Sequence, residues 1–160
     1  MSLIRMRWIL CVVVLSVVSV HAQEVDDIEW TTYGGDLTST RYSPADLITA
    51  DNFNDLEVAW RLKTDNFGPA PEYNFQSTPL MVDGVLYSPN GVGLVEAFDP
   101  GTGRTLWVQE PVVEGPDGDL LDAYLTGAST RGVAHWSDGT DSRILVQRGE
   151  YLYVLDARTG

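Results

Sequence analysis

The sequence predicts an all-β protein made of repeated antiparallel units, because one motif occurs twice and strand-like stretches surround it. Residues 97–107 read A-F-D-P-G-T-G-R-T-L-W, and residues 155–160 read L-D-A-R-T-G, 57 positions further on. An apolar stretch precedes each copy. One such unit cannot bury its own apolar face, so the repeat predicts an array of similar sheets. The second copy stops before its tryptophan, and we therefore expect the front piece of a longer protein, with a tryptophan near position 164.

The repeated motif has a mechanical interpretation as a turn followed by a returning strand. Asp99 can accept hydrogen bonds from backbone N–H groups just downstream. Gly101 and Gly103 permit a positive φ, at which a Cβ would clash. Trp107 opens the returning strand with a flat side chain suited to packing between sheets. We expect the four tryptophans Trp30, Trp60, Trp107 and Trp136 to pack in the core or between sheets.

Short stretches rich in β-branched or aromatic residues recur along the chain, separated by turn signals. The predicted strands are 58–62, 78–82, 85–88, 94–98, 106–108, 132–136, 143–147 and 151–155. Asp83-Gly84 and Asp138-Gly139 predict tight hairpins. Residues 50–56 predict one helical turn capped by Thr49 or Asp51, and residues 66–74 and 114–122 predict loops. Four-stranded antiparallel sheets in an array fit a β-propeller best.

The first 22 residues resemble a cleavable export signal. Arg5 and Arg7 precede an apolar run from Trp8 to Val20 that is short for a membrane span of about 20 residues. Val20-His21-Ala22 places small residues at a cleavage position. We expect residues 1–22 to be the signal and 23–160 the domain, which would be periplasmic or secreted. An uncleaved, membrane-associated anchor is the alternative.

Composition limits the partners. The chain has 23 acidic and 10 basic residues, and removal of residues 1–22 would leave a net charge of about −15 and no cysteine. A binding site for nucleic acid needs clustered Lys and Arg, so such a partner is not expected. An exported chain without disulfides depends on a large core.

Several blocks of the sequence resemble one enzyme family in order along the chain. The blocks are W-T-T-Y-G-G-D-L-T-S-T-R-Y-S-P with its continuation to Ala59-Trp60, S-T-P-L-M-V-D-G-V-L-Y at 77–87, the repeat at 97–107, and T-R-G-V-A-H-W at 130–136. They resemble the start of the pyrroloquinoline quinone (PQQ)-dependent alcohol and sugar dehydrogenases. The resemblance covers nearly all of 30–160.

The resemblance implies the N-terminal blades of an eight-bladed β-propeller with tryptophan-docking repeats. It further implies PQQ held on the propeller axis with a calcium ion, and oxidation of an alcohol or sugar with electrons passed to a quinone or cytochrome c. The family's calcium ligands and catalytic aspartate would lie beyond residue 160. The adjacent cysteine pair of methanol-oxidising members is absent, which favours the glucose-dehydrogenase-like branches.

Two residues match cofactor-binding positions of the family. Arg131 resembles the arginine that contacts the cofactor, and a guanidinium binds carboxylates bidentately. Gln76 stands where many members have a cofactor-contacting glutamate, and it keeps the hydrogen bonding without the charge. His135 replaces a tyrosine and is expected to be structural. Asp117, Asp119 and Asp122 lack the spacing of a calcium loop, so we expect a solvated loop there.

The sequence leaves two other hypotheses about function open. The chain could belong to a non-enzymatic propeller scaffold of the cell envelope that shares the repeat, or to a sugar-binding propeller without redox chemistry. The scaffold predicts a lipidated cysteine after the signal, and the sequence has none there. Metal ligands and a catalytic base further along the chain would separate the enzyme from the sugar-binding protein.

Overall fold

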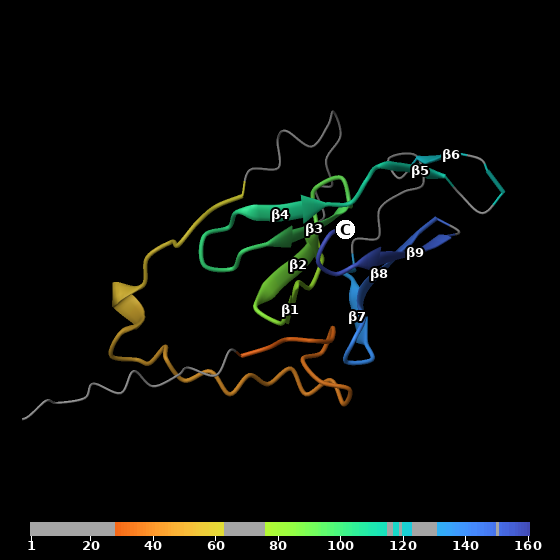
Figure 1. The fold of residues 1–160 in the computed structure, drawn as a ribbon. Helices are drawn as coiled ribbons and strands as arrows, with labels where there is room; N and C mark the ends of the chain where they lie inside the picture. Colours follow the sequence, from red (N-terminus) through yellow and green to blue (C-terminus); the bar gives the residue numbers. More distant parts are fainter. Residues whose placement is uncertain (1–27, 63–75, 115–116, 119, 123–130, 150) are drawn as a thin grey trace, which may run out of the picture.

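The computed structural model describes residues 28–62, 76–114, 117–118, 120–122, 131–149 and 151–160. Their regular structure is antiparallel β-sheet with a single 3₁₀ turn, η1 (Phe53–Asp55). The strands are β1 (Leu80–Val82), β2 (Val85–Pro89), β3 (Val95–Phe98), β4 (Thr105–Val108), β5 (Val112–Glu114), β6 (Leu120–Asp122), β7 (Ala134–Ser137), β8 (Ser142–Arg148) and β9 (Tyr151–Asp156) (Figure 1). The all-β prediction is therefore confirmed for this part of the chain. No helix among these residues has the length and hydropathy of a membrane span.

The first sheet is a four-stranded antiparallel meander in the order β1-β2-β3-β4. Asp83 and Gly84 connect β1 to β2 with φ of 49° and 74°, the two positive values that a type I′ turn requires. This predicted hairpin is confirmed. The register between β3 and β4 shifts at Ala97 and Phe98, just before the motif turn.

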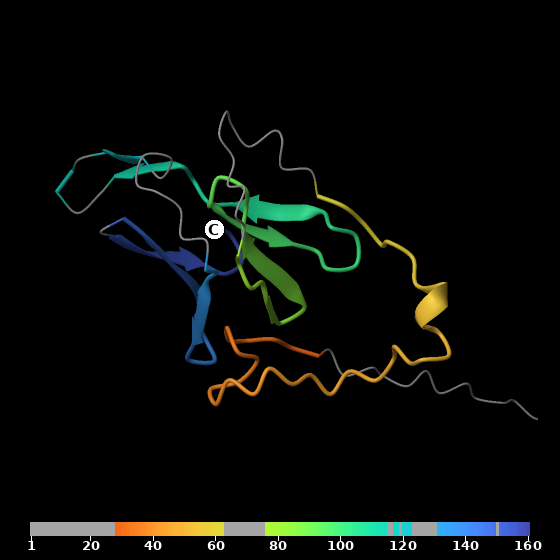
Figure 2. The ribbon, with the colours of Figure 1, turned by 180° about the vertical axis from the view of Figure 1, so that it is seen from behind.

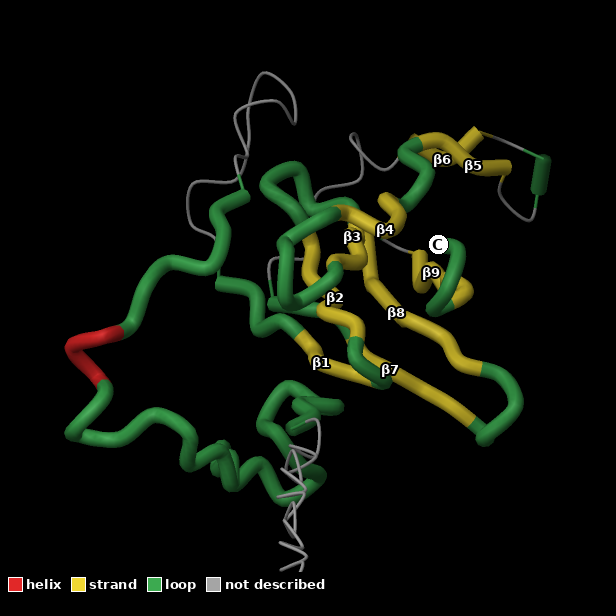
Figure 3. The backbone as a smooth tube through the Cα atoms, turned by 60° about the vertical axis from the view of Figure 1, so that its left-hand side comes forward, coloured by secondary structure: helices red, strands yellow, loops and turns green. Residues whose placement is uncertain are grey.

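The chain then forms a small hairpin and a second large sheet. β5 pairs with β6, and β7, β8 and β9 form a three-stranded antiparallel sheet in chain order. Asp138 and Gly139 lie in the β7–β8 turn, where the Asp138 carboxylate accepts hydrogen bonds from the N–H groups of Thr140 and Asp141. Figure 3 shows the sheet of β7–β9 lying against the sheet of β1–β4.

The core lies between these two sheets. The first sheet contributes Leu80, Val82, Tyr87, Val95 and Ala97, and the second sheet with the residues flanking its strands contributes Val133, Ile144, Val146, Tyr153 and Ala157. The Tyr87 hydroxyl crosses the interface and donates a 3.0 Å hydrogen bond to the carbonyl of Ala157. The sheets are therefore joined by apolar burial and by directional contacts.

The two copies of the motif make equivalent contacts with a tryptophan. The Trp60 indole donates to the carbonyl of Pro100 at 2.8 Å and lies against Gly103. The Trp107 indole donates to the carbonyl of Ala157 at 2.9 Å and lies against Gly160. In both copies, the acceptor is one residue after the motif aspartate and the glycine is four residues after it.

Two predicted segments differ from the structure in the type of element that they form. Residues 58–62 form no strand. They belong to the extended segment that runs beneath β1 and then outside the first sheet (Figures 1 and 2). The predicted loop at 114–122 begins and ends in strands, because Glu114 of β5 pairs with Leu120 of β6.

The helical turn is shorter than predicted, and the predicted cap is wrong. Asn52 precedes η1 and its side-chain oxygen accepts a 2.7 Å hydrogen bond from the Thr49 N–H. Trp136 is half exposed and lies outside the core of the described residues, and its packing between sheets stays a prediction. The predicted loop at 66–74 lies outside the described residues.

Candidate functional site

The two segments that carry the candidate site residues lie side by side. A parallel bridge joins Thr78, just before β1, to Gly132, just before β7. Gly132 has a φ of 117°, and a Cβ at this position would lie 2.9 Å from the carbonyl oxygen of Thr78. Glycine at 132 therefore allows the two strands to begin in close contact.

This bridge brings Gln76 and Arg131 to one edge of the fold. Both residues are exposed; Gln76 lies two residues before Thr78, and Arg131 lies directly before Gly132. We call this end of the two large sheets the Arg131 end. Because the strands pair antiparallel, β1, β3, β7 and β9 begin at the Arg131 end, and β2, β4 and β8 finish there. An amide and a guanidinium on neighbouring strand starts form a donor set suited to a ligand with carboxylates.

Side-chain hydrogen bonds order the first sheet at the Arg131 end. The Asn90 side-chain oxygen accepts from the N–H groups of Val92 and Leu94, at 3.2 and 3.0 Å. The Gln109 side-chain oxygen accepts from the Val95 N–H at 3.2 Å, while the Gln109 N–H donates to the Val95 carbonyl. Asn90 and Gln109 are buried, and their side-chain oxygens satisfy backbone N–H groups between β2 and the start of β3.

Sequence reasoning missed the buried polar residues of this end. Arg148, the last residue of β8, is 1% exposed. The sequence carries a signal for this burial. Arg148 follows Ile144 and Val146 at a spacing of two, so its side chain lies on the same face of the strand as these two core residues. A charged residue in phase with buried residues points to a specific partner or ligand.

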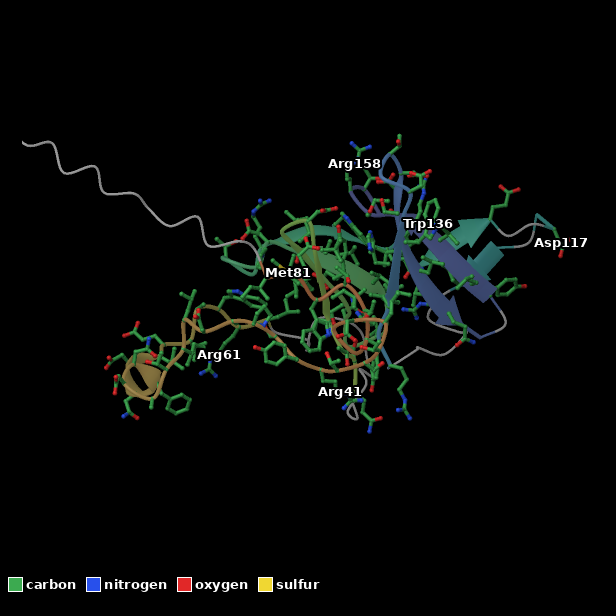
Figure 4. The ribbon with its side chains drawn as sticks, turned by 90° about the horizontal axis from the view of Figure 1, so that it is seen from below. Arg41, Arg61, Met81, Asp117, Trp136 and Arg158 are labelled. Carbon is green, nitrogen blue, oxygen red and sulfur yellow. The ribbon has the colours of Figure 1, made fainter. Side chains whose placement is uncertain are left out.

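The remaining candidates have structural partners or lie apart. The His135 ring nitrogen Nε2 lies 3.0 Å from the Ser142 hydroxyl, across the β7–β8 pair, which fits the expected structural role. Asp117 lies at the tip of the β5–β6 hairpin and points outward (Figure 4). Asp119 lies outside the described residues. Within the described ranges, no three His, Cys, Asp or Glu side chains are grouped as metal ligands.

Comparisons with known proteins agree on one family. A family model described as the β-propeller domain of glucose/ethanol/alcohol dehydrogenases matches residues 30–160. The alcohol dehydrogenase (quinone) dehydrogenase subunit of Gluconacetobacter polyoxogenes is 35% identical over 137 residues, which cover 82% of this chain and 16% of that protein. The 1-butanol dehydrogenase (cytochrome c) of Thauera butanivorans is 31% identical over 134 residues, which cover 82% of this chain and 18% of that protein.

A solved structure gives the same result. The quinohemoprotein alcohol dehydrogenase of Comamonas testosteroni superimposes with a TM-score of 0.59 at 30% sequence identity, covering 82% of this chain and 18% of that one. The chain therefore spans about a sixth of the length of the relatives that it matches.

Proposed function

Because the chain belongs to the PQQ-dependent glucose/ethanol/alcohol dehydrogenase β-propeller family, we propose that it forms the first part of an enzyme that oxidises an alcohol. The observation that carries the proposal is the match over residues 30–160 together with the pairing of the two cofactor-candidate segments at Thr78 and Gly132. When bound, PQQ supplies the acceptor for two electrons from the alcohol carbon. The protein supplies binding, orientation and electrostatics.

Arg131 and Gln76 are the residues of this chain proposed to bind PQQ. Both residues are exposed at adjacent strand starts. The Arg131 guanidinium would donate two hydrogen bonds to a cofactor carboxylate in a bidentate pair. Gln76 would donate its amide N–H to a cofactor oxygen. Calcium, with ligands expected beyond residue 160, belongs to the same proposal.

The architecture proposed for the whole protein is an eight-bladed propeller with tryptophan docking between blades. The equivalent contacts of Trp60 and Trp107 with successive motif turns support it. The segment 1–22 is proposed as an export signal, which would bring the domain to the periplasm. There a quinone or cytochrome c would be the electron acceptor, and the latter appears in the name of the Thauera butanivorans relative.

The substrate proposed is an alcohol, because the relatives described above carry alcohol or butanol in their names. Oxidation of a sugar by a glucose-dehydrogenase-like branch is the second candidate, and its support is the absence of cysteine from residues 23–160. Dye-linked assays with primary alcohols and with glucose on the protein from the complete gene would separate the two.

The cofactor proposal is tested by titrating PQQ, with calcium present, into cofactor-free protein from the complete gene and following its absorbance. Arg131→Ala should weaken binding by about 1.5–3 kcal/mol, the range for a hydrogen bond to a charged group. Arg131→Lys should recover part of the affinity, because an ammonium lacks the planar fork. The control is Arg104→Ala, an exposed arginine in the β3–β4 turn. Unchanged PQQ affinity in folded Arg131→Ala protein would remove Arg131 from the site.

The export proposal has its own measurement. Mass spectrometry of the exported protein should find Gln23 at the N-terminus. Mature protein that retains Met1 would instead support the uncleaved anchor.

A further inference from the structure

Among the residues that the structure describes, Arg148 is a buried cation without a counter-charge. It is 1% exposed, and its guanidinium nitrogens Nε, Nη1 and Nη2 have no hydrogen-bond partner among the described residues. The ion-paired arginines of this part of the chain behave differently: Arg104 and Arg143 are exposed or partly exposed and pair with aspartates. A buried charge without a partner costs several kcal/mol, so a fold that retains one is expected to satisfy it.

Tyr153 provides a second unpaired donor beside this guanidinium. Arg148 pairs with Tyr151 and Val146 pairs with Tyr153, so Arg148 and Tyr153 are diagonal neighbours on one face of the sheet. The Tyr153 hydroxyl is buried without a hydrogen-bond partner among the described residues.

The first sheet adds two amide groups at the same end. The Asn90 and Gln109 side-chain oxygens are used by backbone N–H groups, which leaves their nitrogens Nδ2 and Nε2 buried and unpaired within the described part of the chain. The unpaired groups from both sheets at the Arg131 end are thus mainly donors. An ionised carboxylate only accepts hydrogen bonds, and its negative charge would balance the positive charge of Arg148.

The buried carboxylate Glu96 is not the counter-charge of Arg148. Glu96 is 2% exposed and has one oxygen bonded to the Thr105 hydroxyl and one without a partner in the described ranges. It alternates with Val95 and Ala97, which face the core between the sheets, so Glu96 lies on the opposite face of β3.

We propose that Arg148 and Tyr153 form a buried binding position for one carboxylate group at the Arg131 end. The carboxylate accepts two hydrogen bonds from the guanidinium and one from the tyrosine hydroxyl. It comes either from an acidic side chain of the same protein or from a small carboxylate ligand, and the chemistry of recognition is the same. The site is separate from Arg131 and Gln76 and does not depend on PQQ.

The sign of a mutational effect tests this proposal. Replacing a buried arginine that has no partner with a similar apolar side chain is neutral or stabilising, whereas removing one member of a buried pair strands the other charge. Arg148→Met should therefore raise the unfolding equilibrium constant by about a hundredfold or more if a carboxylate is bound. Tyr153→Phe, which keeps the ring and removes only the hydroxyl, should raise the constant less.

The experiment is denaturant unfolding of protein from the complete gene, without PQQ, for wild type, Arg148→Met, Tyr153→Phe and the exposed control Arg104→Met. A parallel series adds acetate or formate at constant ionic strength against chloride. Destabilisation by Arg148→Met and Tyr153→Phe with no acetate effect identifies a side chain of the protein as the source. A saturable acetate stabilisation of the wild type that Arg148→Met abolishes identifies a free carboxylate. The proposal is overturned if both variants match or exceed wild-type stability and acetate has no effect.

Discussion

At the scale of single residues, aspartates shape the turns of this protein. The carboxylates of Asp99, Asp138 and Asp156 each accept hydrogen bonds from the backbone N–H groups two and three residues downstream. Hydrogen bonds lower the pKa of each of these three carboxyl groups. Asp36 bonds to both the N–H and hydroxyl groups of Thr38 and Thr40. Its pKa falls from 3.8 to about 2, mainly because of the Thr40 hydroxyl.

The Asp36 turn should consequently weaken in acid. A carboxyl whose pKa is lower in the folded state stabilises the fold above its unfolded pKa and loses this contribution as pH falls through the folded value. We expect the Asp36 carboxyl carbon to titrate by NMR with a pKa of about 2. The stability of wild type should also decline more steeply than that of Asp36→Asn between about pH 4 and pH 2. A midpoint near the ordinary value of 3.8 would show that the four hydrogen bonds are absent.

At the scale of elements, a tryptophan and a glycine connect each motif turn to another segment. Gly103 has a φ of 69° and lies against the Trp60 ring, and Gly160 has a φ of 94° and lies against Trp107. Trp60 also stacks on Phe98, with ring centroids 6.3 Å apart. The glycine serves two purposes in the motif, since it supplies a left-handed backbone and leaves room for a ring.

These two purposes can be separated with a matched pair of glycines. Gly84 has a φ of 74°, and a Cβ added there would meet nothing within 4 Å, whereas a Cβ on Gly103 would overlap the Trp60 ring. We expect Gly84→Ala to cost about 1–2 kcal/mol, the backbone contribution alone. Gly103→Ala should cost more and change the fluorescence of Trp60. Equal unfolding free energies for the two variants would contradict the packing role of Gly103.

At the scale of the whole described molecule, the two large sheets share one buried apolar layer. Ile144 is fully buried in this layer, on the strand that lies between β7 and β9. Side chains of residues 80–97 meet those of residues 133–157 there. The sheets therefore support each other, as sheets in a repeat array do.

Shortening Ile144 should measure this support in two steps. Ile144→Val should cost about 0.5–1.5 kcal/mol and Ile144→Ala about 2–5 kcal/mol of unfolding free energy, because the second leaves a larger cavity. Chemical denaturation followed by circular dichroism gives both values. A cost below about 0.5 kcal/mol for Ile144→Ala would show that the two sheets do not share a core.

Local chemistry made several features predictable from the sequence. The Asp83-Gly84 turn needs positive φ at both residues, and few residue pairs besides Asp-Gly allow this. The repeated Asp-x-x-Thr-Gly turn depends on hydrogen bonds within a short stretch of chain, so its two copies predicted two similar turns. Short runs of β-branched and aromatic residues between turn signals placed most strands correctly, since both signals depend on a short stretch of chain.

Contacts between distant segments were decided only by the tertiary structure. Residues 58–62 have the composition of a strand, but no described strand pairs with them. The bridge between Thr78 and Gly132 joins positions 54 residues apart and places Gln76 and Arg131 at one edge, and spacing along the chain carries no such information. Arg148 and Tyr153 became a candidate site only when pairing of β8 with β9 placed both donors on one buried face. The sequence alone therefore determined the hairpin and motif turns, most strand positions and the family. The tertiary structure decided which distant polar groups meet, because burial and pairing depend on the whole arrangement of the sheets.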